Sequence, residues 1–261
     1  MENLNISNNQ IKQFRLLKEK KYRQESAMFL VEGQKMIEEA LRSVYILDTL
    51  ICTSEWAESH RDLTKIFMGN LCLATSRQIE QISNLNTPQS VLGVLKIPHF
   101  KIEFPGCCKE LCLFLDSISD PGNLGTILRL ADWFGIEDVF CNLGTVDLYN
   151  PKVVQATMGS IFRVKVHYID GVAFLNQYCN KSGNAIYGAS LQGENIFQAS
   201  LDKKGLIVLG NESTGISKEI EGFIDKKIFI PSYPEKRNTA ESLNVSVAAA
   251  IICSEFRRRN H

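Results

Sequence analysis

The chain has 261 residues, with 29 basic and 29 acidic side chains and a formal net charge of zero at pH 7. Hydrophobic residues make up 44% of it and charged residues 22%, as in a soluble globular protein. No segment has the roughly 18 uninterrupted apolar residues of a membrane span, and the opening MENLNISNNQIKQF lacks an apolar signal core. These features argue against a membrane protein, a secreted protein and an indiscriminate nucleic-acid binder.

Eight cysteines are present, and none belongs to a C-x-x-C pair. Cys107, Cys108 and Cys112 lie close together in sequence but lack nearby histidines. This pattern is atypical of a zinc site and typical of reduced thiols, several of them in the core. We therefore expect a cytoplasmic protein without a metal site.

The first predicted element is a basic helix near the N-terminus. Asn8 or Asn9 is expected to cap it, and Ile11, Phe14 and Leu17 form one apolar stripe. Such a charge cluster is either a solvated helix face or a phosphate-binding patch, as is the arginine run at 257–259. Between residues 12 and 23 there is one acid, Glu19, and there are six basic residues: Lys12, Arg15, Lys18, Lys20, Lys21 and Arg23.

The rest of the first hundred residues predicts a small α/β unit. In chain order we expect a strand at 27–31, a helix at 34–41, a strand at 48–53, helices at 54–59 and 77–85 (the second capped by Ser76), and a strand at 91–97, with 66–75 left open as a further strand. Residues 98–109 contain two prolines and a glycine and are the predicted linker.

Beyond the linker, short apolar runs alternate with helical patterns. This alternation predicts a parallel sheet covered by helices on both faces. Strands are expected at 111–115, 139–142, 163–166, 185–188, 206–209 and 227–230, and helices at 126–134, 151–158, 172–179, 217–222 and 244–258.

The most informative stretch is 111–135, LCLFLDSISDPGNLGTILRLADWFG. Its first five residues predict a strand buried on both sides, and residues 119–125 have the composition of a turn. Asn123 in this turn and Arg129 on the following helix form either an ordinary strand–helix connection or part of a ligand site. The glycines do not spell G-x-G-x-x-G, so a classical dinucleotide fingerprint is absent.

Two further strand ends have a similar composition. The strand at 206–209 runs into Gly210, Asn211 and Glu212, and glycine at 210 would let a ligand approach the backbone. The strand ending at Ile230-Pro231 is followed by SLNVSVAAAI, in which Ser242 or Asn244 is expected to cap the last helix. Each loop alone also fits a plain turn or a helix cap.

Taken in this order, Asn123 with Arg129, then LGNESTG, then IP followed by SLNVSVAAAI resemble the SpoU (TrmH-like) family of RNA 2'-O-ribose methyltransferases, in the SPOUT superfamily. The resemblance covers residues from about 111 to 258. The first block is similar, more loosely, to the substrate-binding domain of many members, through its basic helix and FLVEG at 29–33. We therefore expect an RNA substrate-binding domain at 1–105 and a methyltransferase domain at 106–261.

The resemblance implies an α/β fold whose C-terminal parallel-sheet domain contains a deep trefoil knot, beside a smaller N-terminal α/β domain. It implies S-adenosylmethionine as cofactor and a homodimer joined through the C-terminal domain. By position in the motifs, it assigns cofactor binding to Leu209, Gly210, Ile230 and Leu243. It assigns catalysis to Arg129, Asn123, Glu212, Ser242 and Asn244, and RNA binding falls to the basic residues of the first helix.

One segment departs from the family pattern. Residues 232–241, SYPEKRNTAE, form a longer connection than usual and contain no glycine, although Ser242-Leu243-Asn244 is intact. The cofactor contacts of this loop are therefore the least defined part of the expected site.

The expected reaction is methylation of a ribose 2'-hydroxyl in structured RNA, with ribosomal RNA favoured over tRNA because tRNA-modifying relatives generally lack such an N-terminal domain. Arg129 either accepts the hydroxyl proton or stabilises the developing alkoxide, because a guanidinium with a pKa above about 12 is a poor base. The alternatives are a tRNA methyltransferase, a non-catalytic RNA-binding protein on the same fold, and a small-molecule enzyme.

Overall fold

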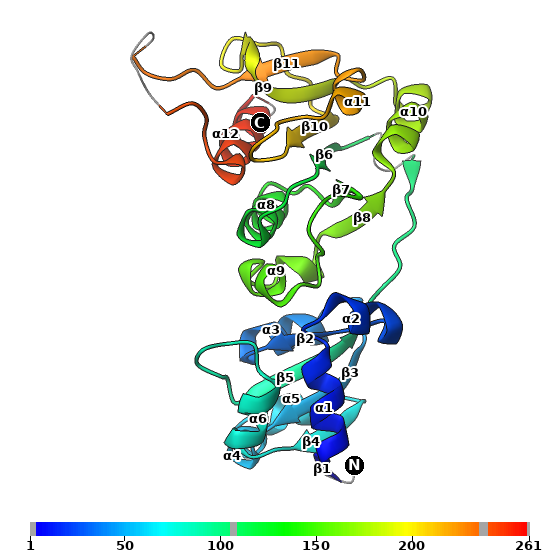
Figure 1. The fold of residues 1–261 in the computed structure, drawn as a ribbon, viewed down its shortest axis with the longest axis vertical. Helices are drawn as coiled ribbons and strands as arrows, with labels where there is room; N and C mark the ends of the chain where they lie inside the picture. The colour runs from blue at the N-terminus through cyan, green and yellow to red at the C-terminus, as the bar shows by residue number, and fades with distance from the viewer. Residues whose placement is uncertain (1–3, 105–108, 235–239, 260–261) are drawn as a thin grey trace. The chain divides into compact units, whose positions relative to one another are not determined.

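The computed structural model describes residues 4–104, 109–234 and 240–259. The chain divides into two compact units, one made of Met1–His99 with Asp147–Arg163 and the other of Phe100–Val146 with Val164–His261 (Figure 1). The predicted linker falls at the start of the second unit. Its residues 105–108, which include the adjacent cysteines 107 and 108, lie outside the described residues.

The first unit contains a five-stranded mixed sheet in the order β1-β4-β3-β5-β2. β5 runs antiparallel to both of its neighbours, whereas β1, β4 and β3 are mutually parallel. The strands are β1 (Leu4–Asn5), β2 (Met28–Glu32), β3 (Leu47–Cys52), β4 (Asn70–Leu73) and β5 (Val91–Lys96). The helices are α1 (Asn8–Leu16), α2 (Lys20–Ser26), α3 (Gln34–Leu41), α4 (Ser54–Ser59), α5 (Arg61–Ile66), α6 (Ser76–Ile82) and α9 (Pro151–Ala156), with the short 3₁₀ helix η1 (Ser160–Phe162).

Two predicted helix caps in this unit are wrong by one residue. Ser7 caps α1 in place of Asn8 or Asn9, and Thr75 caps α6 in place of Ser76. In both helices the hydroxyl accepts from the backbone N–H three residues later, while Gln10 or Gln78 reaches back to the cap residue. This reciprocal capping box satisfies two N–H groups at once, and the competing side chains cannot match it.

Residues 147–163 belong to the first unit and pack against its N-terminal part, Met1–His99, although they follow that part by about fifty residues. Asp147 accepts from the guanidinium of Arg23, at 2.5 and 3.2 Å. The Tyr149 ring lies 4.6 Å from that of Phe29, measured between centroids. Arg163 forms an ion pair with Glu39 on α3. These contacts place 147–163 against β2 and α3. From the sequence alone, the segment is expected among the later strands.

The second unit is built on a six-stranded sheet in the order β11-β9-β10-β6-β7-β8, and every pair of neighbours is parallel. Its strands are β6 (Leu111–Asp116), β7 (Asp138–Asn142), β8 (Lys165–Ile169), β9 (Ile186–Asn195), β10 (Gly205–Gly210) and β11 (Lys226–Phe229). Its helices are α8 (Pro121–Trp133), α10 (Gly171–Ser182), α11 (Lys218–Glu221) and α12 (Val245–Arg258).

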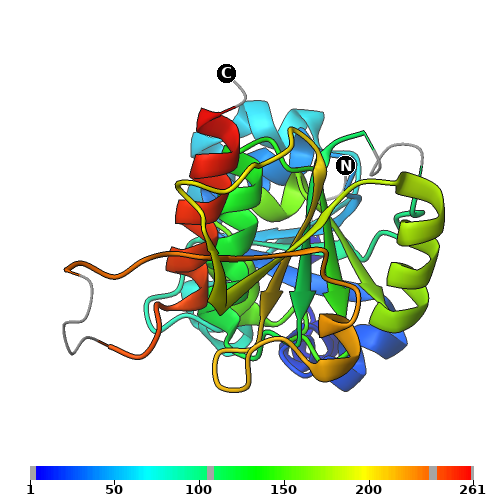
Figure 2. The ribbon, with the colours of Figure 1, turned by 90° about the horizontal axis from the view of Figure 1, so that it is seen from above.

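Helices cover both faces of this sheet. α12 lies along α8 on one face, and α10 lies on the other (Figure 2). All six residues of β6 are buried, as expected for a central parallel strand. Phe174 of α10 stacks on Phe140 of β7 and Phe114 of β6, with centroid distances of 4.2 and 6.3 Å. The predicted α/β class is confirmed, and the trefoil knot stays a prediction.

The chain order of the strands decides where loops meet. β10 lies between β9 and β6, both of which precede it in the chain. In a parallel sheet the carboxyl ends of neighbouring strands share one edge. The loops that follow β6 and β10 therefore come together, although about ninety residues separate them.

The segment after β6 is helical earlier than its composition predicts. α8 begins at Pro121, and the Asp120 carboxylate caps it by accepting from the Asn123 N–H at 2.8 Å. Proline suits the first helical turn because its missing N–H has no partner there in any case. Asn123 is therefore not the cap but a residue of the first turn, and its side-chain amide is available for other contacts.

The arginine run at the C-terminus serves the fold. Arg257 donates to the carbonyl oxygens of Phe134 and Gly135 at the end of α8, at 2.7 and 3.0 Å. Arg258 and Arg259 both donate to the buried carboxylate of Glu255. These contacts satisfy a helix terminus and a buried charge, so the run has a structural role, although the Arg258 side chain is exposed.

Candidate functional site

The loops after β6 and β10 meet the first turns of α8 and α12 in the second unit. Four sequence-predicted residues lie on these elements: Asn123 and Arg129 on α8, Glu212 after β10, and Asn244 as the cap of α12. Three of them are joined by side-chain hydrogen bonds. We call Glu212, Asn123, Asn244 and their partners Ser119, Asp120 and Ser246 the polar network.

The Glu212 carboxylate is the centre of the polar network. One oxygen accepts from the Ser119 N–H at 3.1 Å and from its hydroxyl at 2.9 Å. The other accepts from the Asp120 N–H at 3.2 Å and from the Asn123 amide at 2.9 Å. Four donors thus converge on one carboxylate, and they fix the loop after β6 against the loop after β10.

This arrangement lowers the pKa of Glu212 from 4.5 to about 2. Burial by itself raises the pKa of the carboxyl, because it disfavours the charged form. The hydrogen bonds from Asn123, Ser119 and Asp120 act in the opposite direction and prevail. Glu212 is therefore a carboxylate at neutral pH and acts as an acceptor and not as an acid.

Asn123 links Glu212 to the start of α12. Its amide nitrogen donates to Glu212, and its oxygen accepts from the Asn244 amide at 2.9 Å. The Asn244 oxygen in turn accepts from the Ser246 N–H at 2.9 Å and the Ser246 hydroxyl at 2.6 Å. Both amides are thereby oriented, since reversing either one would bring two donors or two acceptors together.

The loop after β10 folds back upon itself at Gly210. A Cβ at this position would lie 2.3 Å from the carbonyl carbon of Gly215 and from the nitrogen of Ile216. Asn211 pairs with Gly215 through reciprocal backbone hydrogen bonds of 2.9 Å. The glycine is thus required by the loop itself, whereas the sequence suggested only that it leaves room for a ligand.

A buried carboxylate holds the far end of the same loop. Asp116, the last residue of β6, is 1% exposed and accepts from the Ser217 N–H at 2.7 Å. It also accepts from the Asn142 side chain at 2.9 Å, while Asn211 donates to the Ser117 carbonyl at 2.7 Å. The loop 211–217 is therefore tied at both ends to the end of β6.

Arg129 stands apart from the polar network. It lies six residues after Asn123 on α8, which places it about 120° around the helix axis and about 9 Å along it. Its side chain is exposed and has no hydrogen-bond or ion-pair partner among the described residues. A free guanidinium beside an ordered scaffold can bind an anion or stabilise a developing oxyanion.

The remaining predicted cofactor residues differ in what they expose. Leu209 is fully buried, so only its backbone is available to a ligand. Ile230 is half-buried, and Ser242 and Leu243 are exposed just before α12. Of the long connection at 232–241, residues 235–239 lie outside the described residues.

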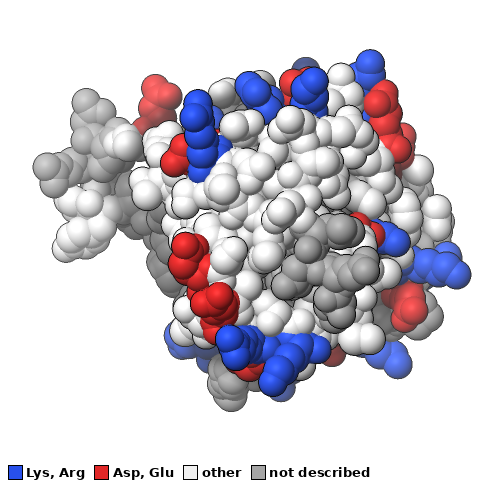
Figure 3. Space-filling view, turned by 90° about the horizontal axis from the view of Figure 1, so that it is seen from below, with Lys and Arg blue, Asp and Glu red and all other residues white. Residues whose placement is uncertain are grey.

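The prediction that the basic residues share one helix is wrong: Lys12 and Arg15 lie on α1, Lys20, Lys21 and Arg23 lie on α2, and Lys18 lies in the turn between the two helices. Lys12, Arg15, Lys18, Lys20 and Lys21 are exposed. Arg23 is 3% exposed and donates to the Leu17 carbonyl at 2.8 Å as well as to Asp147, so its guanidinium is engaged within the fold. In Figure 3, Lys and Arg side chains are interspersed with Asp and Glu around an uncharged area, as the zero net charge leads one to expect.

Sequence reasoning missed Ser119, Asp120 and Asp116, which order the loops of the site through hydrogen bonds. The signal for Asp120 was present, because aspartate before proline is a common helix start. Asp116 had no comparable signal. Its role depends on Ser217, which lies about a hundred residues later in the chain.

No metal site is evident in the part of the chain that the structure describes: no group of three or more His, Cys, Asp or Glu side chains is placed to hold an ion. The cysteines described, at 52, 72, 112, 141, 179 and 253, are free thiols. Within the same residues, no helix is long and apolar enough to cross a membrane.

Two families of known sequences match this chain. The SpoU rRNA Methylase family matches residues 110–254, which contain the whole polar network. The chain belongs to this family. An MRM3-like substrate binding domain matches residues 8–93, within the first unit. The SpoU match includes residues 147–163, which pack with the first unit.

Individual relatives support the assignment over nearly the full length. The 23S rRNA (guanosine(2553)-2'-O)-methyltransferase RlmP of Bacillus subtilis is 30% identical over 96% of both chains. A TrmH-family RNA methyltransferase structure from Porphyromonas gingivalis is 36% identical, with a TM-score of 0.83 over 97% of this chain and 99% of the other. An AdoMet-bound rRNA methyltransferase from Sinorhizobium meliloti is 26% identical, with a TM-score of 0.85 over 98% and 97%.

Proposed function

We propose that this SpoU-family chain methylates the 2'-hydroxyl of a ribose in ribosomal RNA, using S-adenosylmethionine. The observation that carries the proposal is the polar network, in which Asn123 is held between Glu212 and Asn244 at hydrogen-bond distances of 2.9 Å. A non-catalytic RNA-binding protein has no need for this ordering. The rRNA methyltransferase relatives, which match both units, support ribosomal RNA over tRNA.

The residues present fit an S-adenosylmethionine site built from backbone groups. The folded-back loop at Gly210 and the exposed backbone before α12 offer donors and acceptors at the strand ends where ligands of open α/β sheets bind. Leu209, Gly210, Ile230 and Leu243 are the residues that we expect to hold it. When bound, S-adenosylmethionine would supply a methyl group on a sulfonium. The leaving group of the transfer would be the neutral thioether.

The chain's own residues position the ribose and manage its proton. The polar network is held by hydrogen bonds within the chain itself, so it can position the ribose with little reorganisation. To the exposed Arg129 guanidinium we assign the negative charge that grows on the 2'-oxygen as its proton leaves. Arg129 stabilises this alkoxide while the proton passes to solvent water, or accepts the proton itself if the complete site perturbs it strongly. Glu212, with a pKa of about 2, is a poor proton acceptor at neutral pH and is assigned to positioning.

RNA recognition is assigned to the first unit, through the exposed residues Lys12, Arg15, Lys18, Lys20 and Lys21. We also propose that the protein is a homodimer joined through the second unit, with a knotted chain path, and that it acts in the cytoplasm. The small residues Ala248 and Ala250 on the half-exposed side of α12 permit close helix packing. The free cysteines fit a reducing compartment.

One experiment tests the reaction and its substrate. The purified chain is incubated with methyl-labelled S-adenosylmethionine and, separately, with rRNA, tRNA and small nucleosides from cells lacking the protein. We expect label in rRNA, resistant to alkaline hydrolysis at a single linkage because a methylated 2'-oxygen cannot attack the neighbouring phosphate. Label in tRNA alone would support the tRNA alternative, label in nucleosides a small-molecule enzyme, and no transfer a binding protein.

A further inference from the structure

The first unit contains a pocket of about 710 Å³ that the assigned chemistry does not use. Four stretches of that unit line it: 18–19 after α1, 30–36 from β2 into α3, 84–89 after α6, and 150–158 on and after α9. Its volume lies within the roughly 300–1,000 Å³ of small-ligand sites. We call it the lysine-rimmed pocket.

The rim of this pocket carries three lysines from three different stretches. Lys18, Lys35 and Lys152 are all exposed, and none forms an ion pair with another described residue. The pocket also contains two acids. Glu32 accepts from the Ser83 hydroxyl at 2.5 Å and the Asn84 N–H at 2.8 Å, so its carboxylate is already oriented away from a ligand by two neutral donors. Against Glu19 and Glu32, the three lysines give the pocket lining a formal net charge of +1, which suits a phosphate.

The pocket combines apolar walls with free amides on exposed side chains. Side chains of Gln89 and Gln155 line the pocket and make no hydrogen bond within the described part of the chain. Amides can both donate to and accept from the edge of a nucleobase. The apolar walls, suited to the faces of a base, are formed by Leu30, Val31, Met36, Leu85, Val154 and Met158.

The backbone at one wall is strained. Met158 has a φ of 50°, which is unusual for a side chain of its size, and Gly159 follows with a φ of 99°. The strain turns the chain sharply after α9, and the Met158 side chain remains 49% exposed beside the pocket. Conformations of this kind persist where the surroundings enforce them and are common at ligand sites.

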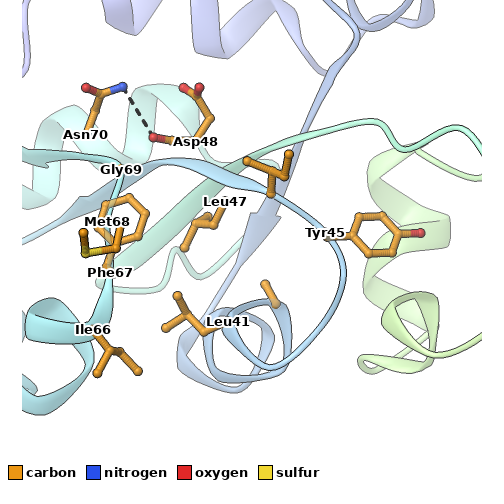
Figure 4. A pocket seen from close by; sticks show the side chains of 11 residues that line it. Leu41, Tyr45, Leu47, Asp48, Ile66, Phe67, Met68, Gly69 and Asn70 are labelled. Carbon is orange, nitrogen blue, oxygen red and sulfur yellow. Dashed lines mark hydrogen bonds between the residues drawn. The ribbon is translucent and has the colours of Figure 1, made fainter.

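A second hollow in the same unit provides a contrast (Figure 4). It has a volume of about 500 Å³ and is lined by residues of 40–48 and 66–70. Asp48 is the one charged residue among those lining it, and the Met68 side chain beside it is 89% exposed. This hollow carries no lysine to meet a phosphate, so it serves as an internal control.

We propose that the lysine-rimmed pocket binds one unstacked nucleotide of the RNA substrate, with its base between the apolar walls and its phosphates at Lys18, Lys35 and Lys152. The inference rests on the proposed function and adds a defined binding site to it. Single-stranded or bulged nucleotides are the usual targets of sequence-specific RNA recognition, because their base edges are accessible. The segment 147–163 then has a role in recognition, although it lies within the match to the methylase family.

The test compares two pocket variants of the full chain with two matched controls. Gln155→Trp fills the pocket from an exposed position, and Met68→Trp fills the second hollow in the same way. Lys152→Glu reverses a rim charge, and Lys65→Glu makes the same change on α5, outside the pocket. Binding to a bulged rRNA fragment is measured by fluorescence anisotropy, and S-adenosylmethionine binding by calorimetry.

We expect the two pocket variants to bind RNA about tenfold more weakly, since one base stack or one phosphate contact has roughly this value. The controls should stay within about twofold, and cofactor affinity should not change. RNA that contains 4-thiouridine at the bulge should crosslink to peptides within 150–158. Equal RNA affinity of all four variants, or crosslinks that map only elsewhere, would refute nucleotide binding in the lysine-rimmed pocket.

Methionine-methyl NMR separates this inference from the proposed function. Met36 and Met158 report on the lysine-rimmed pocket, and Met68 reports on the second hollow. If the wild-type chain neither binds nor methylates rRNA, the proposed function fails. Titration with adenosine and uridine 5'-monophosphates then tests whether the pocket binds a nucleotide. Chemical-shift changes at Met36 and Met158 that Gln155→Trp abolishes would support binding, and unchanged signals would refute it.

Discussion

The polar network of the second unit and the lysine-rimmed pocket of the first use polar groups in opposite ways. In the network, Glu212 and Asn123 have their hydrogen-bonding capacity filled by other parts of the chain. In the pocket, Gln155 and Lys152 have no partner within the described residues. A site that must hold reacting atoms in place benefits from groups that are already ordered. A site that selects among nucleotides needs unsatisfied groups for the ligand to satisfy.

This difference predicts which property the mutations in each unit should change. Substitutions in the second unit should change turnover or loop stability, because its contacts are intramolecular. Substitutions in the first unit should change RNA affinity and its salt dependence, because its free groups await a ligand. The four predictions that follow test this separation, from the largest expected effect to the smallest.

Arg129→Ala is expected to have the largest effect. Removing the exposed guanidinium should lower the rate of methyl transfer about 100-fold or more, because a group that stabilises developing charge acts only in the transition state. S-adenosylmethionine affinity should stay within a few fold in calorimetry. Arg77→Ala, which removes an exposed arginine from α6, is the matched control. Substantial turnover by Arg129→Ala would make this residue an ordinary surface side chain.

Gly210→Ala is expected to disorder the loop after β10. The new Cβ would overlap the backbone of Gly215 and Ile216, so the loop must move. We expect S-adenosylmethionine affinity to fall at least about tenfold while the far-ultraviolet circular dichroism is retained. Gly222→Ala is the control, because its Cβ would meet nothing closer than the Glu219 carbonyl oxygen at 4.0 Å. Unchanged affinity of Gly210→Ala would show that the cofactor does not depend on this loop.

Glu212→Gln is expected to lower the free energy of unfolding by about 1–3 kcal/mol, because an amide nitrogen would face donors that now bind a carboxylate. The carboxylate has a pKa of about 2 when folded and 4.5 ordinarily, so its stabilisation is complete above pH 4.5. That stabilisation is lost as the pH falls from about 4.5 to about 2.

The difference in unfolding free energy between wild type and Glu212→Gln should therefore shrink across this acid range. The comparison removes the contribution of Glu255, whose pKa the Arg258 and Arg259 guanidinium groups also lower to about 2, because both proteins contain it. Denaturant titrations at several pH values measure the difference. A difference that stays constant between pH 5 and pH 2 would contradict the assigned hydrogen bonds.

Reversing Lys12, Arg15 and Lys20 to Glu should have the smallest effect per residue. These exposed side chains can each lose one phosphate contact, so the log–log salt dependence of RNA binding should flatten by about 2 to 3 units. Cofactor affinity, measured in parallel, should be unchanged. A salt dependence equal to that of wild type would place the RNA on another face of the first unit. Arg23 is excluded from this set because its guanidinium is buried against Asp147.

Local signals in the sequence were sufficient for most elements. The helix at Gln34–Leu41 and the central strand from Leu111 were predicted within a residue, because apolar periodicity and burial pattern depend on neighbouring residues. Helix starts were less predictable. Several capping residues compete at 7–9 and at 75–76, and only the three-dimensional capping box selects Ser7 and Thr75.

The short α5 and the two-residue β1 were not predicted. α5 follows His60, which makes no side-chain cap hydrogen bond, so the local sequence gives no helix start there. β1 has too few positions for a periodic pattern, and it exists because it pairs with β4 far along the chain. β9 also extends well beyond its predicted end, to Asn195, where it pairs with β11. For β1 and β9, a partner strand supplies the hydrogen bonds that the local sequence does not specify.

The sequence by itself determined the α/β class, the order of the strands along the chain and the motif residues Asn123, Arg129, Glu212 and Asn244. Only the tertiary structure decided what those residues do to one another. It joined Glu212 to the first turn of α8, gave Gly210 a steric role within its own loop, buried Arg23, and placed 147–163 with the first unit. The physical reason is that hydrogen bonds and packing act over a few ångströms in space, and a parallel sheet brings together strand ends that are about ninety residues apart in sequence.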